Sequence, residues 1–283
     1  MQQNVTFSIG SIGIVDKVNE KYDLLNSIFG KGFGRTKNIP EIAKLLITNR
    51  LDKSASVHRL QELYPLEFFK ELGFKEIPSE RNIYRGIERI GMRFNALMEK
   101  YQSIIKKHDL NSKKQFPDFS SSYFEGKKSE LGALGYSRDS QPGKNQFVWG
   151  ISTGINGIPS ALTVQKGNLV DKKHWKVMLK CLAKILEKGA LLIFDCGANT
   201  KKNKEKIREK GFHYLTLKPK KKSPYRKYIK IFHGSKQEKI VANATELRVR
   251  ETRGRGRIPI HFLFQETEAR TTQEKKKKIQ ALA

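Results

Sequence analysis

The sequence predicts an α/β domain with a mixed sheet flanked by helices, an all-α region before it and a basic, β-rich segment after it. Hydrophobic residues recur at spacings of three and four between residues 39 and 107. From residue 111 the pattern becomes strand, hairpin, helix, buried strand, helix, strand. We therefore expect three regions: a mainly helical region at 1–110, an α/β core at 111–218, and basic strands with a frayed tail at 219–283.

The N-terminal region reads as packed helices. Ile42 and Leu45 begin a helical pattern that continues to residue 72, and a second helix is predicted over Arg81–Lys107 with Ser79 as its N-cap. The segment GKGFG at 30–34 lacks the GK[ST] ending of a phosphate-binding loop and is predicted to be an ordinary loop. Such helices could enter a DNA groove, but packing against one another is the more common use of an amphipathic helix.

The core region contains two aspartates on predicted strands. Asp118 lies within the alternating run FPDFSSSYF, and Asp195 ends LLIFD, an apolar run typical of a strand buried on both faces. Between them, Asn156-Gly157 predicts a hairpin, and a helix with Asp171 as N-cap is predicted to end at Gly189. If the strands of Asp118 and Asp195 are adjacent and parallel, the two side chains meet.

Charge indicates a polyanionic partner. The chain carries a net charge of +28, and residues 201–283 alone hold 25 Lys and Arg against 8 Asp and Glu. Such an excess is typical of nucleic-acid binding. No apolar stretch approaches the roughly 20 residues of a membrane span, and the two cysteines lack zinc-ligand spacing. We expect a cytoplasmic protein that binds neither a membrane nor a structural zinc ion.

Two carboxylates on neighbouring strands form a minimal site for Mg²⁺, which prefers carboxylate oxygens and keeps several waters. Taken singly, Asp118 could equally be an edge-strand or turn residue, and Asp195 a helix N-cap after a strand. Together with the strand order and the basic charge, the pair favours metal-dependent chemistry on nucleic acid.

An ordered string of motifs extends this interpretation. The motifs are DFSSSYFEG at 118–126, GYSRD at 135–139 with Gln146 following, GIP at 157–159, GNLVD at 167–171 and FDCGANTKKN at 194–203. In these motifs, roughly from Leu45 to Lys218, the chain resembles the DDE transposases of prokaryotic insertion sequences, whose catalytic domain has the ribonuclease H-like fold. The resemblance implies a DNA transposase that binds Mg²⁺ or Mn²⁺ through Asp118 and Asp195. It also implies that the enzyme cleaves and transfers DNA strands at element ends and target DNA, and acts as a homo-oligomer.

The sequence departs from the family at two places. Cys196 follows Asp195 where an arginine is common, and no helix with the third acid, a glutamate preceded by tyrosine and arginine, is found before Ala283. Glu266, Glu268 and Glu274 read as a solvated face instead. The resemblance thus predicts a truncated or split copy. It leaves open an active transposase, a catalytically inactive DNA-binding protein and, less favoured, a host nuclease on the same scaffold.

Basic residues around the predicted site and in the C-terminal segment are candidates for phosphate contacts, with solvated charge as the alternative. They are Arg138, Lys144, Lys201, Lys202, Lys218, Arg253, Arg255 and Arg257. Glu125 could help to hold a metal ion, but a salt bridge to Lys127 or Lys128 is favoured. His174 has no partner at ligand spacing and is expected to be structural.

Overall fold

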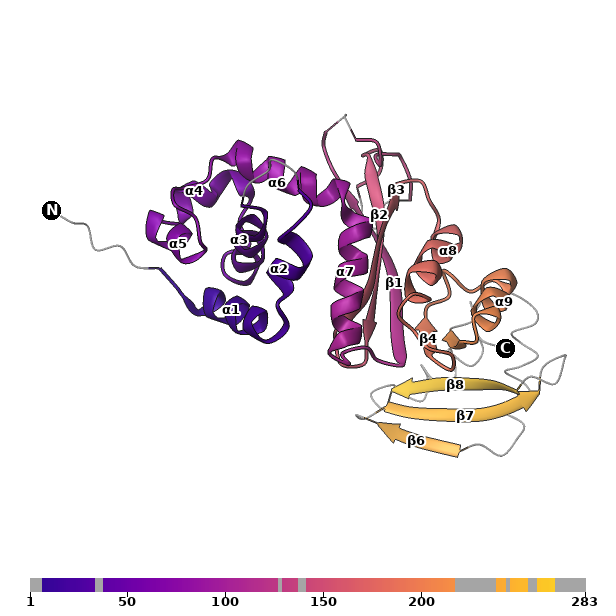
Figure 1. Cartoon of the computed structure of the whole chain (residues 1–283). Coiled ribbons are helices and arrows are strands. Elements are labelled where there is room, and N and C mark those ends of the chain that lie inside the picture. The colour runs from indigo at the N-terminus through magenta and orange to yellow at the C-terminus, as the bar shows by residue number, and fades with distance from the viewer. Residues whose placement is uncertain are drawn as a thin grey trace. The chain divides into compact units, whose positions relative to one another are not determined.

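The computed structural model describes residues 7–33, 38–126, 129–136 and 141–216, together with the backbone of three strands between 238 and 267. The chain divides into two compact units, Met1–Leu217 and Lys218–Ala283 (Figure 1). Within the described residues, no helix is both long and apolar enough to cross a membrane.

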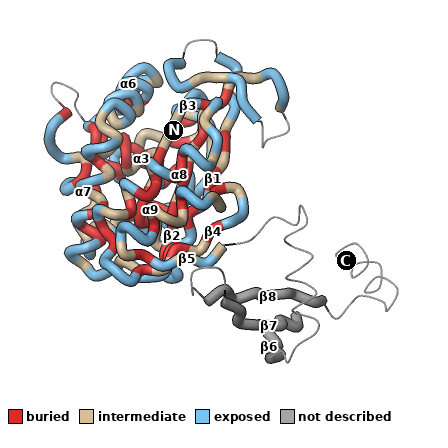
Figure 2. Tube along the Cα trace, turned by 90° about the vertical axis from the view of Figure 1, so that its right-hand side faces the viewer, coloured by how far each residue is buried: buried red, intermediate tan, exposed pale blue. Residues whose placement is uncertain are grey.

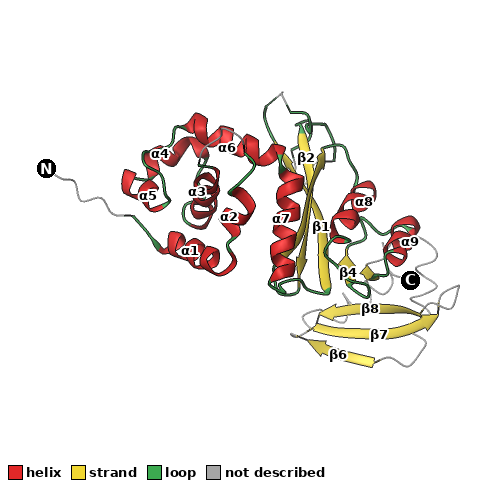
Figure 3. Cartoon of the chain, in the orientation of Figure 1, coloured by secondary structure: helices red, strands yellow, loops and turns green. Residues whose placement is uncertain are grey.

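The first unit begins with a helical region, of which only the part from residue 39 onward was predicted (Figure 3). The helices of this region are α1 (Gly10–Tyr22), α2 (Leu24–Phe29), α3 (Ile39–Leu51), a 3₁₀ turn (Val57–Arg59), α4 (Leu60–Leu63), α5 (Leu66–Glu71), α6 (Glu80–Met92) and α7 (Phe94–Lys107). Their core is fully buried at Leu45, Leu60 and Ile83 and at the adjacent rings of Phe68 and Phe69. Helices α1, α3, α4, α5 and α6 therefore share an apolar centre of their own, whereas α7 contributes Ile105 to the core of the sheet.

One detail of these helices differs from the sequence-based prediction, and another confirms it. The helix predicted over Arg81–Lys107 is interrupted at Arg93, whose backbone is not helical. The Arg93 guanidinium lies 5.3 Å from the centre of the Phe33 ring, a contact between distant parts of the chain. The predicted cap is confirmed, since the Ser79 hydroxyl accepts a hydrogen bond from the Asn82 amide.

The second part of this unit is a five-stranded sheet. Its strands are β1 (Lys114–Tyr123), β2 (Gln146–Gly154), β3 (Pro159–Lys166), β4 (Leu191–Phe194) and β5 (His213–Thr216), in the order β3-β2-β1-β4-β5. Neighbours β1, β2 and β3 are antiparallel, while β1, β4 and β5 run parallel. This mixed order, with helices attached, is the ribonuclease H-like sheet that the sequence predicted. The predicted β2–β3 hairpin turns at Gly157, where φ is +77°.

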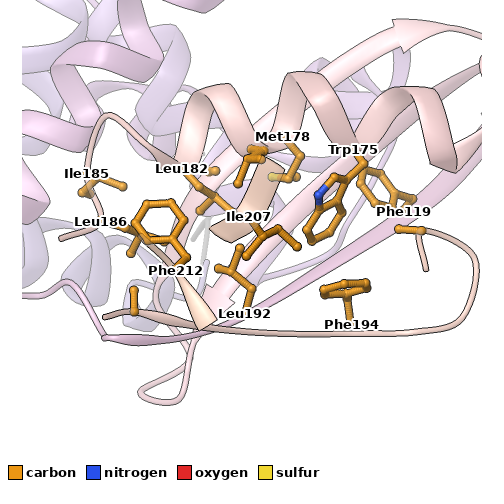
Figure 4. Close-up of a cluster of buried hydrophobic side chains, with 14 of the residues drawn as sticks. Phe119, Trp175, Met178, Leu182, Ile185, Leu186, Leu192, Phe194, Ile207 and Phe212 are labelled. Carbon is orange, nitrogen blue, oxygen red and sulfur yellow. The ribbon is translucent and has the colours of Figure 1, made fainter. Parts of the chain in front are cut away.

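Helices α8 (Asp171–Leu182) and α9 (Lys201–Glu209) pack with α7 on one face of the sheet. Figure 4 shows the Trp175 ring of α8 among the buried apolar side chains between helices and sheet. The centroid of this ring lies 4.3 Å from that of Phe194 in β4. Two predictions about α8 were wrong. Val170 holds the N-cap position and Asp171 is the first helical residue, and the helix ends at Leu182, well before Gly189.

Burial along β4 alternates, which corrects the prediction of a strand buried on both faces. Leu192 and Phe194 are buried, whereas Leu191 and Ile193 are only partly covered. Figure 2 shows the buried positions gathered where the strands meet α8 and α9. The described helices of this layer cover only one face of the sheet. Residues of β4 that point to the other face are therefore only partly buried, although the whole run is apolar and β4 is parallel to its neighbours.

The second unit contains an antiparallel sheet in the order β6-β7-β8, formed by Glu238–Ala242, Thr245–Arg253 and Pro259–Thr267. These strands confirm the β-rich character predicted for residues 219–283. The other residues of that segment, including the predicted frayed tail, lie outside the described residues.

Candidate active site

Asp118 lies in the middle of β1 with its side chain exposed. The neighbouring positions Pro117 and Phe119 are buried. The Phe119 ring packs against His174 and Trp175 of α8. Strand alternation then directs Asp118 to the opposite face of the sheet. Its Oδ1 atom accepts a hydrogen bond of 2.8 Å from the Phe119 amide.

Asp195 follows the last residue of β4 and is also exposed. Its Oδ1 atom accepts a 3.0 Å hydrogen bond from the Gly197 amide. Its carbonyl oxygen accepts a 2.9 Å hydrogen bond from the Thr216 hydroxyl at the end of β5. The residue is therefore held at the carboxyl end of a parallel strand, where open α/β sheets bind ligands.

The strands of the two aspartates are adjacent and parallel, as predicted. Lys114 stands opposite Leu191, and Gln115 opposite Leu192. Asp118 lies three residues beyond Gln115, and Asp195 lies three residues beyond Leu192, so both acids follow the paired stretch at the same distance along the chain. Their role as catalytic metal ligands stays a prediction.

A third carboxylate lies close to Asp195. A Cβ atom placed on Gly197 would be 2.9 Å from Asp171 Oδ2 and 3.2 Å from both carboxylate oxygens of Asp195. Because both distances are measured from the same point, Asp171 Oδ2 and the Asp195 carboxylate oxygens are at most about 6 Å apart. The sequence-based interpretation gave Asp171 only a capping role, although GNLVD was among the motifs that signalled the resemblance.

Within the described residues, no three His, Cys, Asp or Glu side chains gather into a ready metal-binding group. The donors are carboxylates in pairs, and Mg²⁺ usually binds through one or two carboxylates and completes its shell with water and substrate phosphates. The carboxylate oxygens of Asp171 and Asp195 around the space that Gly197 leaves open fit the donor set of a hydrated Mg²⁺ or Mn²⁺ ion.

Two further motifs meet at Gln146, a buried side chain at the start of β2. Its amide nitrogen donates to the carbonyl oxygens of Tyr136 (3.0 Å) and Gly167 (2.9 Å). A Cβ atom on Gly135 would be 2.2 Å from the Gly167 oxygen, so only glycine fits there. The Gln146 amide thus joins the GYSRD and GNLVD segments and positions the start of α8.

Lys144, a predicted DNA contact, forms an ion pair with Glu125 at 2.6 Å. The hydrogen bond and charge of Lys144 lower the pKa of the Glu125 carboxyl, and those of Glu125 raise the pKa of Lys144. The sequence-based partners proposed for Glu125, Lys127 and Lys128, lie outside the described residues. Lys144 would have to leave Glu125 in order to contact a DNA phosphate.

Lys201 and Lys202 open α9, whose first turn contains no acidic residue. Lys201 lies 3.9 Å from Glu205 one turn later, with its side chain almost fully exposed. The Thr200 hydroxyl caps the helix by accepting from the Asn203 amide. Among the remaining candidates, Arg138, Lys218, Arg255 and Arg257 lie outside the described residues, and only the backbone of Arg253 is described, at the end of β7.

His174 is structural, as predicted. It is fully buried in α8, and its Nε2 atom lies 2.9 Å from the Thr163 hydroxyl of β3. This contact ties α8 to the sheet and leaves His174 remote from solvent.

No protein-family model and no curated protein matches the sequence. Two similar solved structures are transposase–DNA complexes. The piggyBac transposase synaptic complex with hairpin DNA is 9% identical, with a TM-score of 0.44, over 89% of this chain and 59% of that one. The Mos1 transposase paired-end complex with the left transposon end is 13% identical, with a TM-score of 0.26, over 75% of this chain and 68% of that one. This chain thus spans less than two thirds of the piggyBac protein, and its fold assignment rests on the strand order of its own sheet.

Proposed function

We propose that this chain is a DDE-type DNA transposase that cleaves a DNA strand at the end of an insertion element and transfers it to target DNA. The observation that carries the proposal is the placement of Asp118 and Asp195 on adjacent parallel strands of a ribonuclease H-like sheet. A chain with a net charge of +28 draws DNA to these two acids.

The two aspartates would hold Mg²⁺ or Mn²⁺. When bound, such an ion stabilises the charge that develops on the phosphate and lowers the pKa of a water. Without a cation, the exposed carboxylates of Asp118 and Asp195 repel the phosphodiester backbone. The role of Asp118 and Asp195 would be to hold this ion at the scissile phosphate. Asp195 is itself kept in place by the Gly197 amide and the Thr216 hydroxyl.

The start of α9, six residues after Asp195 in the chain, supports a phosphate-binding role. The N-terminus of a helix carries partial positive charge, so acidic residues are stabilising there and lysines are not. Lys201 and Lys202 nevertheless occupy the first turn. Lysines at this end do not stabilise the helix. They form a positively charged surface that can bind DNA phosphates.

The partners that follow from this proposal are double-stranded element ends, target DNA and a second copy of the chain. The test is cleavage of supercoiled plasmid with Mg²⁺ by the wild type, by Asp195→Asn and by Glu88→Gln, which removes an exposed carboxylate on α6. We expect EDTA to abolish nicking, Asp195→Asn to reduce it by about tenfold or more, and Glu88→Gln to leave it unchanged.

Equal nicking by the wild type and Asp195→Asn would remove Asp195 from catalysis. A wild type that binds DNA with a strong salt dependence but nicks no plasmid would instead support the inactive DNA-binding protein.

A further inference from the structure

The pair formed by Asp171 and Asp195 joins residues that the sequence keeps far apart. Asp171 begins α8, and Asp195 ends the strand that follows that helix. Their carboxylates converge on the position where Gly197 would carry a side chain. A divalent cation bound by Asp195 would therefore lie within reach of the Asp171 carboxylate.

We infer that Asp171 is a further metal ligand, which shares with Asp195 the divalent cation of the proposed transposase. The inference rests on that proposed function, because the ion is the one that Asp195 would hold for strand cleavage. It adds a third carboxylate, after Asp118 and Asp195, from within the described part of the chain, where the sequence showed no complete acidic triad.

The helix alone accounts for only part of this arrangement. An acid in the first turn of α8 interacts favourably with the helix dipole, which explains an aspartate at position 171. The Asp195 carboxylate is held on the same side by the hydrogen bond that it accepts from the Gly197 amide. A cation bound there would contact both carboxylates.

Gly197 gives a second way to test the pair. It is not among the glycines with positive φ, so its backbone accepts an alanine. Its requirement is space, since an added Cβ would come within 2.9 Å of Asp171 and 3.2 Å of Asp195. Gly197→Ala therefore disturbs the pair without removing a charge.

The experiment measures Mn²⁺ binding to the full chain by electron paramagnetic resonance, which counts the free ion and needs no DNA. The variants are Asp171→Asn, Asp195→Asn and Gly197→Ala. Glu80→Gln is the control for Asp171→Asn, because Glu80 is also the first residue of a helix, α6. Gly91→Ala is the control for Gly197→Ala, because a Cβ there meets open space. Circular dichroism checks that each variant is folded.

We expect Asp171→Asn and Asp195→Asn each to weaken Mn²⁺ binding by about tenfold or more, Gly197→Ala to weaken it measurably, and both controls to bind as the wild type does. Folded Asp171→Asn that binds Mn²⁺ as tightly as the wild type, while Asp195→Asn does not, would overturn the role of Asp171 and leave the proposed function standing. A wild type that binds no Mn²⁺, or an Asp195→Asn that binds normally, would overturn both.

Discussion

Gly167→Ala is expected to destabilise the sheet unit strongly. Gly167 follows β3, where its amide donates to the Leu131 oxygen at 3.0 Å. A Cβ atom would lie 1.9 Å from the carbonyl oxygen of Gln146 and 2.6 Å from that of Ala133. Both obstacles are backbone atoms, so no change of side-chain rotamer can relieve them.

The cost follows from the hydrogen bonds that must break. The shorter contact is about 1.5 Å inside the 3.4 Å at which ordinary van der Waals contact begins. Moving the chains apart breaks the two Ala133–Gln146 backbone bonds, each 3.1 Å, and the Gly167–Leu131 bond. At about 1 kcal/mol for each, the free energy of unfolding falls by about 3 kcal/mol.

Urea denaturation followed by tryptophan fluorescence measures this loss. Both tryptophans, Trp149 in β2 and Trp175 in α8, belong to the sheet layer and report on it. With an m-value of about 2 kcal/mol/M, the midpoint falls by about 1.5 M. The control Gly13→Ala, in α1 with open space around its Cβ, is expected to raise stability by about 0.5–1 kcal/mol. A Gly167→Ala midpoint within about 0.3 M of the wild type would refute the reasoning.

Three further predictions follow from single contacts. Replacing Lys201 and Lys202 with alanine should reduce the slope of the logarithm of the DNA-binding constant against the logarithm of salt concentration by about 1.8 in magnitude. Fluorescence anisotropy with duplex DNA measures this slope. An unchanged slope would show that neither lysine contacts a phosphate. Cys196 is exposed, whereas burial raises the pKa of the Cys181 thiol. Iodoacetamide at mildly alkaline pH should therefore modify Cys196 before Cys181, as followed by mass spectrometry. Equal rates of modification at the two cysteines would contradict the burial of Cys181. The hydrogen bond from Lys184 lowers the pKa of Glu99, so their ion pair contributes stability above the usual carboxyl pKa of 4.5 and loses it as the pH falls through the lowered value. The difference in urea midpoint between wild type and Glu99→Gln should therefore be small, since both groups are exposed, and should vanish in acid; a difference that persists there would contradict this origin.

Local patterns predicted the strands and the hairpin well. Alternation marked β1, and Asn156-Gly157 marked the turn between β2 and β3, because both signals depend only on neighbouring residues. Helices α1 and α2 were not predicted, because glycines at 10 and 13 weaken the helical signal and only packing of Ile12 and Val15 compensates. The contact that Arg93 makes with Phe33 at the break between α6 and α7 joins distant parts of the chain, so no local pattern reveals it.

The candidate site was predicted in part for the same reason. Asp118 and Asp195 stand out because each is a polar residue in or beside a strand pattern. Asp171 did not, since beside a helix start a capping role explains an aspartate locally. Its proximity to Asp195 depends on how α8 packs against β4, through contacts such as that between Trp175 and Phe194.

The sequence by itself determined the type of most elements, the strongly positive charge and the two aspartates on neighbouring strands. These follow from the periodicity and composition of short segments. The tertiary structure alone decided the register of β1 against β4, the single covered face of β4, and the convergence of Asp171 and Asp195 beside Gly197. Those features depend on contacts between residues far apart in the chain, where packing and steric exclusion determine which side chains meet.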